Sequence, residues 1–63
     1  MNSAVSFRHN DKFYTEVEAV TLYEADGYLI LTHANDDSSS ISEGGEALFE
    51  ALSGLGIRAN KHP

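Results

Sequence analysis

The chain has 63 residues, no cysteine, 41% hydrophobic residues and a formal net charge of −6 at pH 7. A chain of this length forms one domain, here residues 1–63, with a small core, and the lack of cysteine excludes disulfides and thiolate metal sites. The negative charge repels nucleic acid and anionic membranes and favours a basic protein as partner.

The first half of the chain predicts three antiparallel strands joined by two hairpin turns. Residues 4–8 alternate as a half-buried strand does, and Asn10-Asp11 suits the positive φ angles of a tight turn. The second strand, from Phe13 to about Glu24, is rich in β-branched and aromatic residues. Asp26-Gly27 is a strong hairpin signal, and residues 28–33 return as a third strand that is apolar on both faces.

The second strand changes the face on which its apolar side chains lie. The alternating residues from Phe13 to Val17 share one face of a regular strand, whereas Val20 and Leu22 lie on the other. A β-bulge near Glu18-Ala19 would bring both sets to the core. We therefore expect a bulge in the middle of this strand.

A polar loop is predicted from Ala34 to Ser40, and a single helix follows it. Ser40 and Glu43 have the spacing of a capping box, and Ser42 is a competing N-cap. Gly54 or Gly56 is expected to end the helix.

A helical wheel divides the helix into a core face and an acidic face. The core face comprises Leu48, Ala51, Leu52 and Leu55, and Phe49 lies on the flank. After the helix, residues 57–59 could add a short edge strand. The predicted fold class is therefore α+β: a three-stranded antiparallel meander, with an optional extra edge strand and one C-terminal helix packed on one face.

Acidic and basic residues are segregated along the chain. The four Lys and Arg residues are at positions 8, 12, 58 and 61, and every acid except Asp11 lies between Phe13 and Ile57. Ordinary surfaces mix both signs, so this segment is either a solvated acidic face or a surface for a basic partner. Carboxylates at strand or helix spacing can also imitate the spacing of DNA phosphates. The candidate partner-binding residues are Glu16, Glu18, Glu24, Asp26, Asp36, Asp37, Glu43, Glu46 and Glu50.

The residue patterns do not predict a catalytic site or a metal-binding site. Glu16 and Glu18 share a strand face, but nothing in so small a sheet predicts a cleft for them. His33 with Asp36 and Asp37 could bind a metal only weakly, because the spacings of zinc and calcium sites are missing. We predict a protein that is not an enzyme and has no catalytic residues, no metal site and no cofactor.

The sequence pattern predicts neither a signal peptide nor a membrane-spanning segment. The first ten residues lack the apolar run of a signal peptide, and the longest apolar run, Tyr28 to Leu31, is far short of the ~20 residues that span a bilayer. We expect no membrane contact.

The whole chain resembles the small acidic anti-CRISPR proteins of phages and bacterial mobile elements. The start MNSAVSFRHNDKFY and the loop HANDDSSS are similar to an inhibitor of the type I-C surveillance complex, although that family has no diagnostic motif. We expect a monomer in the cytoplasm of the bacterial host, and the lack of cysteine fits that reducing compartment. It would bind a Cas protein subunit of a type I surveillance complex through an acidic, DNA-mimicking surface and block target DNA binding. The alternative is a small acidic interaction module, an antitoxin or accessory subunit, that pairs with a basic protein.

Overall fold

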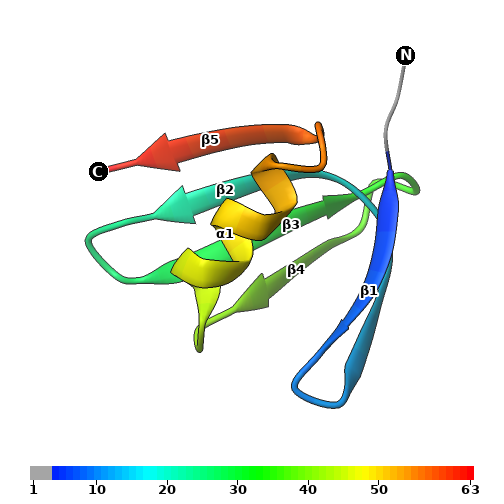
Figure 1. Cartoon of the computed structure of the whole chain (residues 1–63), viewed down its shortest axis with the longest axis horizontal. Coiled ribbons are helices and arrows are strands. Elements are labelled where there is room, and N and C mark those ends of the chain that lie inside the picture. Colours follow the sequence, from blue (N-terminus) through cyan, green and yellow to red (C-terminus); the bar gives the residue numbers. More distant parts are fainter. Residues whose placement is uncertain (1–3) are drawn as a thin grey trace.

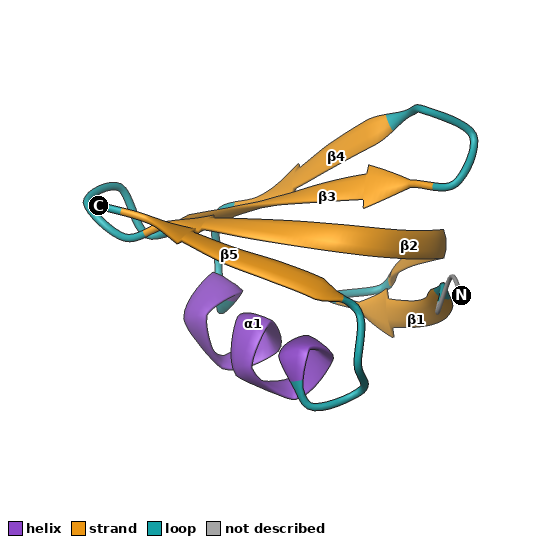
Figure 2. Cartoon of the chain, turned by 90° about the horizontal axis from the view of Figure 1, so that it is seen from above, coloured by secondary structure: helices purple, strands orange, loops and turns teal. Residues whose placement is uncertain are grey.

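A computed structural model of the chain describes residues 4–63, in which a five-stranded sheet carries one helix on one face (Figures 1 and 2). The α+β class and the single helix are confirmed, but the number of strands was predicted too low. The elements in chain order are β1 (Val5–His9), β2 (Lys12–Tyr23), β3 (Tyr28–His33), β4 (Ser38–Ile41), α1 (Gly45–Ser53) and β5 (Arg58–His62).

The long strand β2 lies at the centre of the sheet. Its first half pairs with β1, and its second half pairs with β3 along one edge and with β5, in parallel, along the other. β4 continues the sheet beyond β3 as an antiparallel strand. Figure 2 shows that the helix covers one face and leaves the opposite face, the open face, uncovered.

Two strands lie where the sequence predicted a loop and a tail. The segment predicted as a polar loop, Ala34 to Ser40, contains most of β4, because the free edge of β3 supplies hydrogen-bond partners to a backbone without a hydrophobic pattern. The tail forms a longer strand than residues 57–59, since β5 extends to His62.

β2 contains two bulges, of which the sequence predicted one. The register shifts between Val17 and Ala19 opposite β3, which confirms the predicted bulge. A second shift lies between Tyr14 and Val17 opposite β1. There Glu16 has a φ of 47°, and its backbone N–H donates to the Ser6 hydroxyl over 2.9 Å.

The second bulge changes which aromatic residue enters the core. Tyr14 is only 6% exposed, whereas Phe13 is 59% exposed. The prediction that Phe13 and Thr15 face the core with Val17 is therefore wrong, because the extra residue at the bulge reverses the alternation on its N-terminal side.

The two predicted hairpin turns are confirmed. Asn10 and Asp11 adopt φ angles of 51° and 64°, as the β1–β2 turn requires. Between β2 and β3, Gly27 has a φ of 71°, and its N–H donates to the Tyr23 carbonyl over 2.8 Å.

The core lies between α1 and the covered face of the sheet. Its buried apolar members are Tyr14, Val17, Val20, Leu22, Leu29, Leu31, Ile41, Phe49, Leu52 and Ile57. Val5, Phe7, Leu48 and Ala59 pack around them, partly buried. All five strands and the helix contribute a side chain to this packing.

The helix is rotated from the orientation that the wheel predicted. Phe49 is 6% exposed, whereas Leu55 is 59% exposed and lies beyond the helix end, and Ala51 is also exposed. Gly45 sets this rotation, because a Cβ there would lie 3.3 Å from the Leu29 Cβ. The face centred on Gly45, Phe49 and Leu52 therefore packs on the sheet.

The predicted capping box is wrong. Ser40 belongs to β4, and the N-cap is Gly44, which has a φ of 71° and no side-chain cap hydrogen bond. The predicted stop near Gly54 is confirmed, since α1 ends at Ser53 with Gly54 as C-cap. Within residues 4–63 no helix has the length and apolar character to cross a membrane.

Candidate partner-binding surface

The nine acids predicted to bind a partner all lie outside the core. Eight are exposed, and Glu18 is half-buried. They occupy the bulged part of β2, the two loops that flank β3, the segment before α1 and the outer side of α1. The structure gathers eight of them in two groups rather than in a single row, and Glu50 lies outside both groups.

The turn group lies where β2 turns into β3 and where α1 begins. Gly45 packs against the carbonyl oxygen of Gly27, with its ideal Cβ position 3.5 Å away, so the helix start adjoins the β2–β3 turn. Figure 1 shows this turn and the helix start at the same end of the sheet. The members of the turn group are Glu24, Asp26, Glu43 and Glu46.

The bulge group lies at the opposite end of β3. The backbone carbonyl of Glu16 accepts a hydrogen bond from the Ala34 N–H over 2.9 Å, and the Asp37 carbonyl accepts one from the His33 N–H over 2.9 Å. These bonds hold the bulges of β2 beside the β3–β4 loop. The members of the bulge group are Glu16, Glu18, Asp36 and Asp37.

The length of β3 separates the two groups. Five steps along this six-residue strand, at about 3.4 Å each, place its ends about 17 Å apart. This exceeds the Debye length of about 8 Å at physiological ionic strength, so each group presents its own field to a partner. Glu50 lies one turn beyond Glu46 on the exposed side of α1 and belongs to neither group.

Two regular spacings assumed for the acids are wrong. Glu16 and Glu18 flank Val17 between two register shifts, so the spacing of a regular strand does not apply to them. Glu43 precedes the N-cap Gly44, and only Glu46 and Glu50 are at helical spacing.

Few basic side chains offset the acids. Lys61 Nζ lies 3.9 Å from Glu24 Oε2, and both side chains are about half exposed, at 50% and 45%. Lys61 Nζ also lies 5.7 Å from the centroid of the Phe49 ring. A surface pair of this kind stabilises a fold by about 1 kcal/mol or less, so Lys61 mainly reduces the charge of the turn group.

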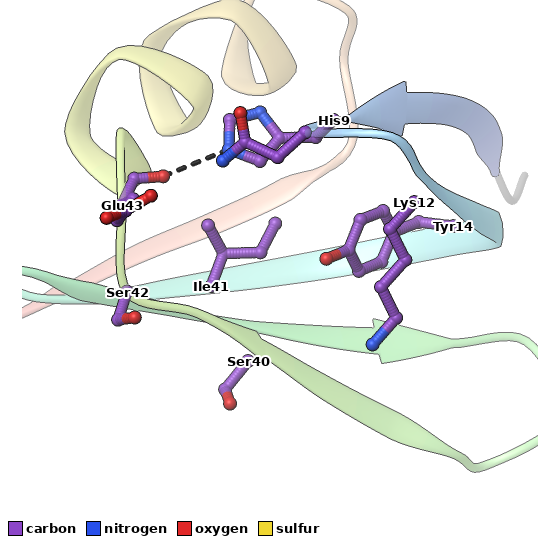
Figure 3. A pocket seen from close by; sticks show the side chains of 8 residues that line it. His9, Lys12, Tyr14, Ser40, Ile41, Ser42 and Glu43 are labelled. Carbon is purple, nitrogen blue, oxygen red and sulfur yellow. Dashed lines mark hydrogen bonds between the residues drawn. The ribbon is translucent and has the colours of Figure 1, made fainter.

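His9 connects the β1–β2 hairpin to the helix start. Its Nε2 lies 2.9 Å from the Glu43 carbonyl oxygen, which accepts the hydrogen bond (Figure 3). A shallow hollow of about 190 Å³ lies beside this contact. It is lined by His9, Asn10, Lys12 and Tyr14 from the hairpin and by Ser40, Ile41, Ser42 and Glu43 from the other side.

His33 is a buried structural residue. It is 6% exposed, with Nδ1 2.5 Å from the Thr15 carbonyl oxygen and Nε2 2.8 Å from the Ser39 hydroxyl. Both ring nitrogens are therefore engaged within the protein. No group of three or more potential metal ligands occurs within residues 4–63.

The open face carries an aromatic row that the sequence analysis missed. Tyr23 stacks on Tyr28 with ring centroids 4.9 Å apart and planes at 6°, and His62 lies 4.9 Å from Tyr23 on the other side. The two tyrosines flank the predicted hairpin turn, so their pairing could have been predicted. The position of His62 depends on the parallel pairing of β5 with β2, for which the sequence has no local signal.

The chain has no significant match among protein-family models, curated protein sequences or solved structures.

Proposed function

We propose that this protein is a non-catalytic inhibitor whose acidic surface binds a basic, DNA-engaging surface of a protein assembly. The observation that carries this proposal is the segregation of charge: no Lys or Arg between Phe13 and Ile57, and nine acids there of which none is buried. A basic protein surface gains favourable electrostatic contacts from such a partner, and nucleic acid is repelled.

The two groups are separated by a distance on the scale of a DNA-binding surface. Their estimated separation of about 17 Å corresponds to about five phosphate steps of 3.4 Å along the helix axis. Two clusters of four carboxylates can therefore meet two separate phosphate-binding points of one basic surface.

The resemblance to small anti-CRISPR proteins narrows the proposed partner. On that basis the assembly is a type I CRISPR surveillance complex in the cytoplasm of the bacterial host. The protein would bind one of its Cas subunits as a monomer and exclude target DNA.

A salt series with variants of each group tests the proposal. The turn variant carries Asp26→Asn, Glu43→Gln and Glu46→Gln, which leaves the Glu24–Lys61 pair intact. The bulge variant carries Glu18→Gln, Asp36→Asn and Asp37→Asn. Asp11→Asn is the matched control, because Asp11 is exposed and lies outside both groups.

The readout is affinity for the purified type I-C surveillance complex. Each exposed ion pair contributes about 0.2–1 kcal/mol, so three neutralised acids should weaken binding about 3- to 150-fold, whereas the control, outside both groups, stays within about twofold. Affinity should also fall as salt rises. An affinity that is flat in salt and unchanged in both triple variants would show that the acidic surface does not bind the complex.

A specific observation keeps the interaction module as a second candidate. The aromatic row of Tyr23, Tyr28 and His62 lies on the open face, and a DNA mimic does not need it. An antitoxin or accessory subunit could use both features against a basic protein. No binding to the surveillance complex, together with capture of another basic protein that Tyr28→Ala and the acidic variants both weaken, would favour this candidate.

A further inference from the structure

β4 presents an unprotected strand edge. It pairs with β3 on one side only, and its sequence SSSI contains no charged residue, no proline and no bulge. Natural sheets usually protect such edges with lysine, proline or bulges. The other edge strands of this sheet follow that rule, since β1 carries Arg8 and β5 carries Arg58 and Lys61 and is followed by Pro63.

The register shows which backbone groups face outward along this edge. The His33 N–H donates to the Asp37 carbonyl, so residues 37, 39 and 41 form hydrogen bonds with β3 in the antiparallel alternation. The N–H and C=O groups of Ser38 and Ser40 therefore point away from the sheet. Both residues are exposed, so these groups are available to an added strand.

The hollow beside β4 gives such a strand a place for a side chain. Figure 3 shows Ile41 pointing from β4 toward the side on which His9 and Tyr14 lie, whereas Ser40 points away. The β1–β2 hairpin forms the opposite wall, so the hollow of about 190 Å³ lies next to the free edge. Alternate side chains of an added strand would enter it on the helix side.

Charge decides what kind of strand fits. Asp36 and Asp37 precede β4 and Glu43 follows it. A second copy pairing antiparallel with Ser40 opposite Ser40 would place Asp37 of each copy opposite Glu43 of the other, and pairing Ser38 with Ser40 would place Asp36 opposite Ser42, next to Glu43. Like charges oppose or adjoin each other in both registers, which is destabilising. A segment with a basic residue at each end meets opposite charges in either direction.

We propose that the outer edge of β4 binds an extended peptide segment with a basic residue at each end, as an added strand. Backbone hydrogen bonds to Ser38 and Ser40 provide the pairing, and the acids at the ends of β4 select the charge. The inference deepens the proposed function and rests on it for the identity of the partner, a basic protein, of which it names the segment that is bound.

The probe is a synthetic peptide, Lys-Thr-Val-Thr-Val-Thr-Lys, with blocked ends. Its two lysines are six residue steps of about 3.3 Å apart in an extended chain. Asp37 and Glu43 are also six residues apart, so each lysine can lie near one acid. One control peptide has Glu in place of both lysines, and a second keeps the lysines but carries backbone N-methyl groups that prevent strand pairing. Amide resonances of the ¹⁵N-labelled protein report where each peptide binds.

We expect the lysine peptide to shift the Ser38 and Ser40 amide resonances and to slow their hydrogen exchange. The Glu and N-methylated peptides should bind at least tenfold more weakly. The variant Ser40→Pro removes one outward N–H at an edge position where proline is tolerated, and should weaken binding at least tenfold. Ser40→Ala keeps that N–H and should bind as the native chain does.

Three results would overturn the inference. The first is equal binding of the N-methylated peptide, which also decides the matter if Ser40→Pro does not fold. The second is that the lysine peptide shifts only the amide resonances of residues outside β4. The third is a dimer of the chain alone that Ser40→Pro dissociates, because a second copy would then occupy the edge.

Binding to the purified surveillance complex separates this inference from the proposed function. If the triple acidic variants lose complex binding and Ser40→Pro keeps it, the proposed function stands and the edge inference fails. If the lysine peptide binds the β4 edge and the native chain does not bind the complex, the edge inference stands and the proposed partner is wrong.

Discussion

Replacing Phe49 by alanine tests the orientation of α1, which the structure sets differently from the helical wheel. Phe49 is 6% exposed and Leu55 is 59% exposed, whereas the wheel placed Leu55 on the core face and Phe49 on the flank. Phe49→Ala should therefore be strongly destabilising, and Leu55→Ala, just beyond the end of α1, is the control.

The magnitude follows from burial and packing. Phe→Ala in a core costs about 3–5 kcal/mol, and the contact between Lys61 Nζ and the ring, 5.7 Å from its centroid, is lost as well. A domain of this size has a total stability of roughly 3–9 kcal/mol at 0.05–0.15 kcal/mol per residue. The variant should therefore lose about half of its stability or fail to fold, whereas Leu55→Ala should stay within about 0.5 kcal/mol of the native chain.

Urea and thermal unfolding, followed by circular dichroism, measure both variants. A loss of 3 kcal/mol corresponds to a fall in Tm of about 12 °C or more in so small a domain. Phe49→Leu, which keeps part of the apolar contact, gives an intermediate value if the alanine variant does not fold. A cost below about 1 kcal/mol for Phe49→Ala, or an equal cost for Leu55→Ala, would refute the described orientation of the helix.

Three further predictions concern buried hydrogen bonds and backbone strain. His33→Leu should lower the free energy of unfolding by about 2–4 kcal/mol in urea titrations, because it leaves the Thr15 carbonyl and the Ser39 hydroxyl without a partner; an unchanged midpoint would contradict this. Glu16→Gly should raise the free energy of unfolding by up to about 1 kcal/mol, since Glu16 has a φ of 47°, whereas Glu16→Ala should show no such gain. Gly27→Ala should lower Tm through a cost of about 1–2 kcal/mol that is purely conformational, because its φ is 71° and nothing lies within 4 Å of the added Cβ; a neutral result would place this turn in another conformation.

The division of the acids into two groups shapes how a partner would bind. Because the groups are about 17 Å apart, more than twice the Debye length, their contributions to binding should be nearly additive. Neutralising both groups should therefore cost about the sum of the two separate losses. One continuous row of carboxylates would give a coupled response instead.

The sequence by itself determined the two hairpin turns, one bulge of β2 and the excess of acids in the middle of the chain. Asn10-Asp11 and Gly27 produce turns because Asn and Asp tolerate positive φ angles and Gly, without a Cβ, adopts them freely. The phase change in β2 required a bulge near Glu18. The excess of acids between Phe13 and Ile57 is also a property of the sequence alone. All of these follow from short-range sterics, side-chain alternation or counting.

The tertiary structure decided the features that depend on distant partners. β4 forms from a serine-rich segment because β3 offers it a free edge, and α1 turns Phe49 inward because Gly45 fits closely against Leu29. For the same reason the acids gather at the two ends of β3 rather than along one line. The sequence supplied the charges, but the strand pairing and the bulges, which join residues far apart in the chain, decided where those charges lie.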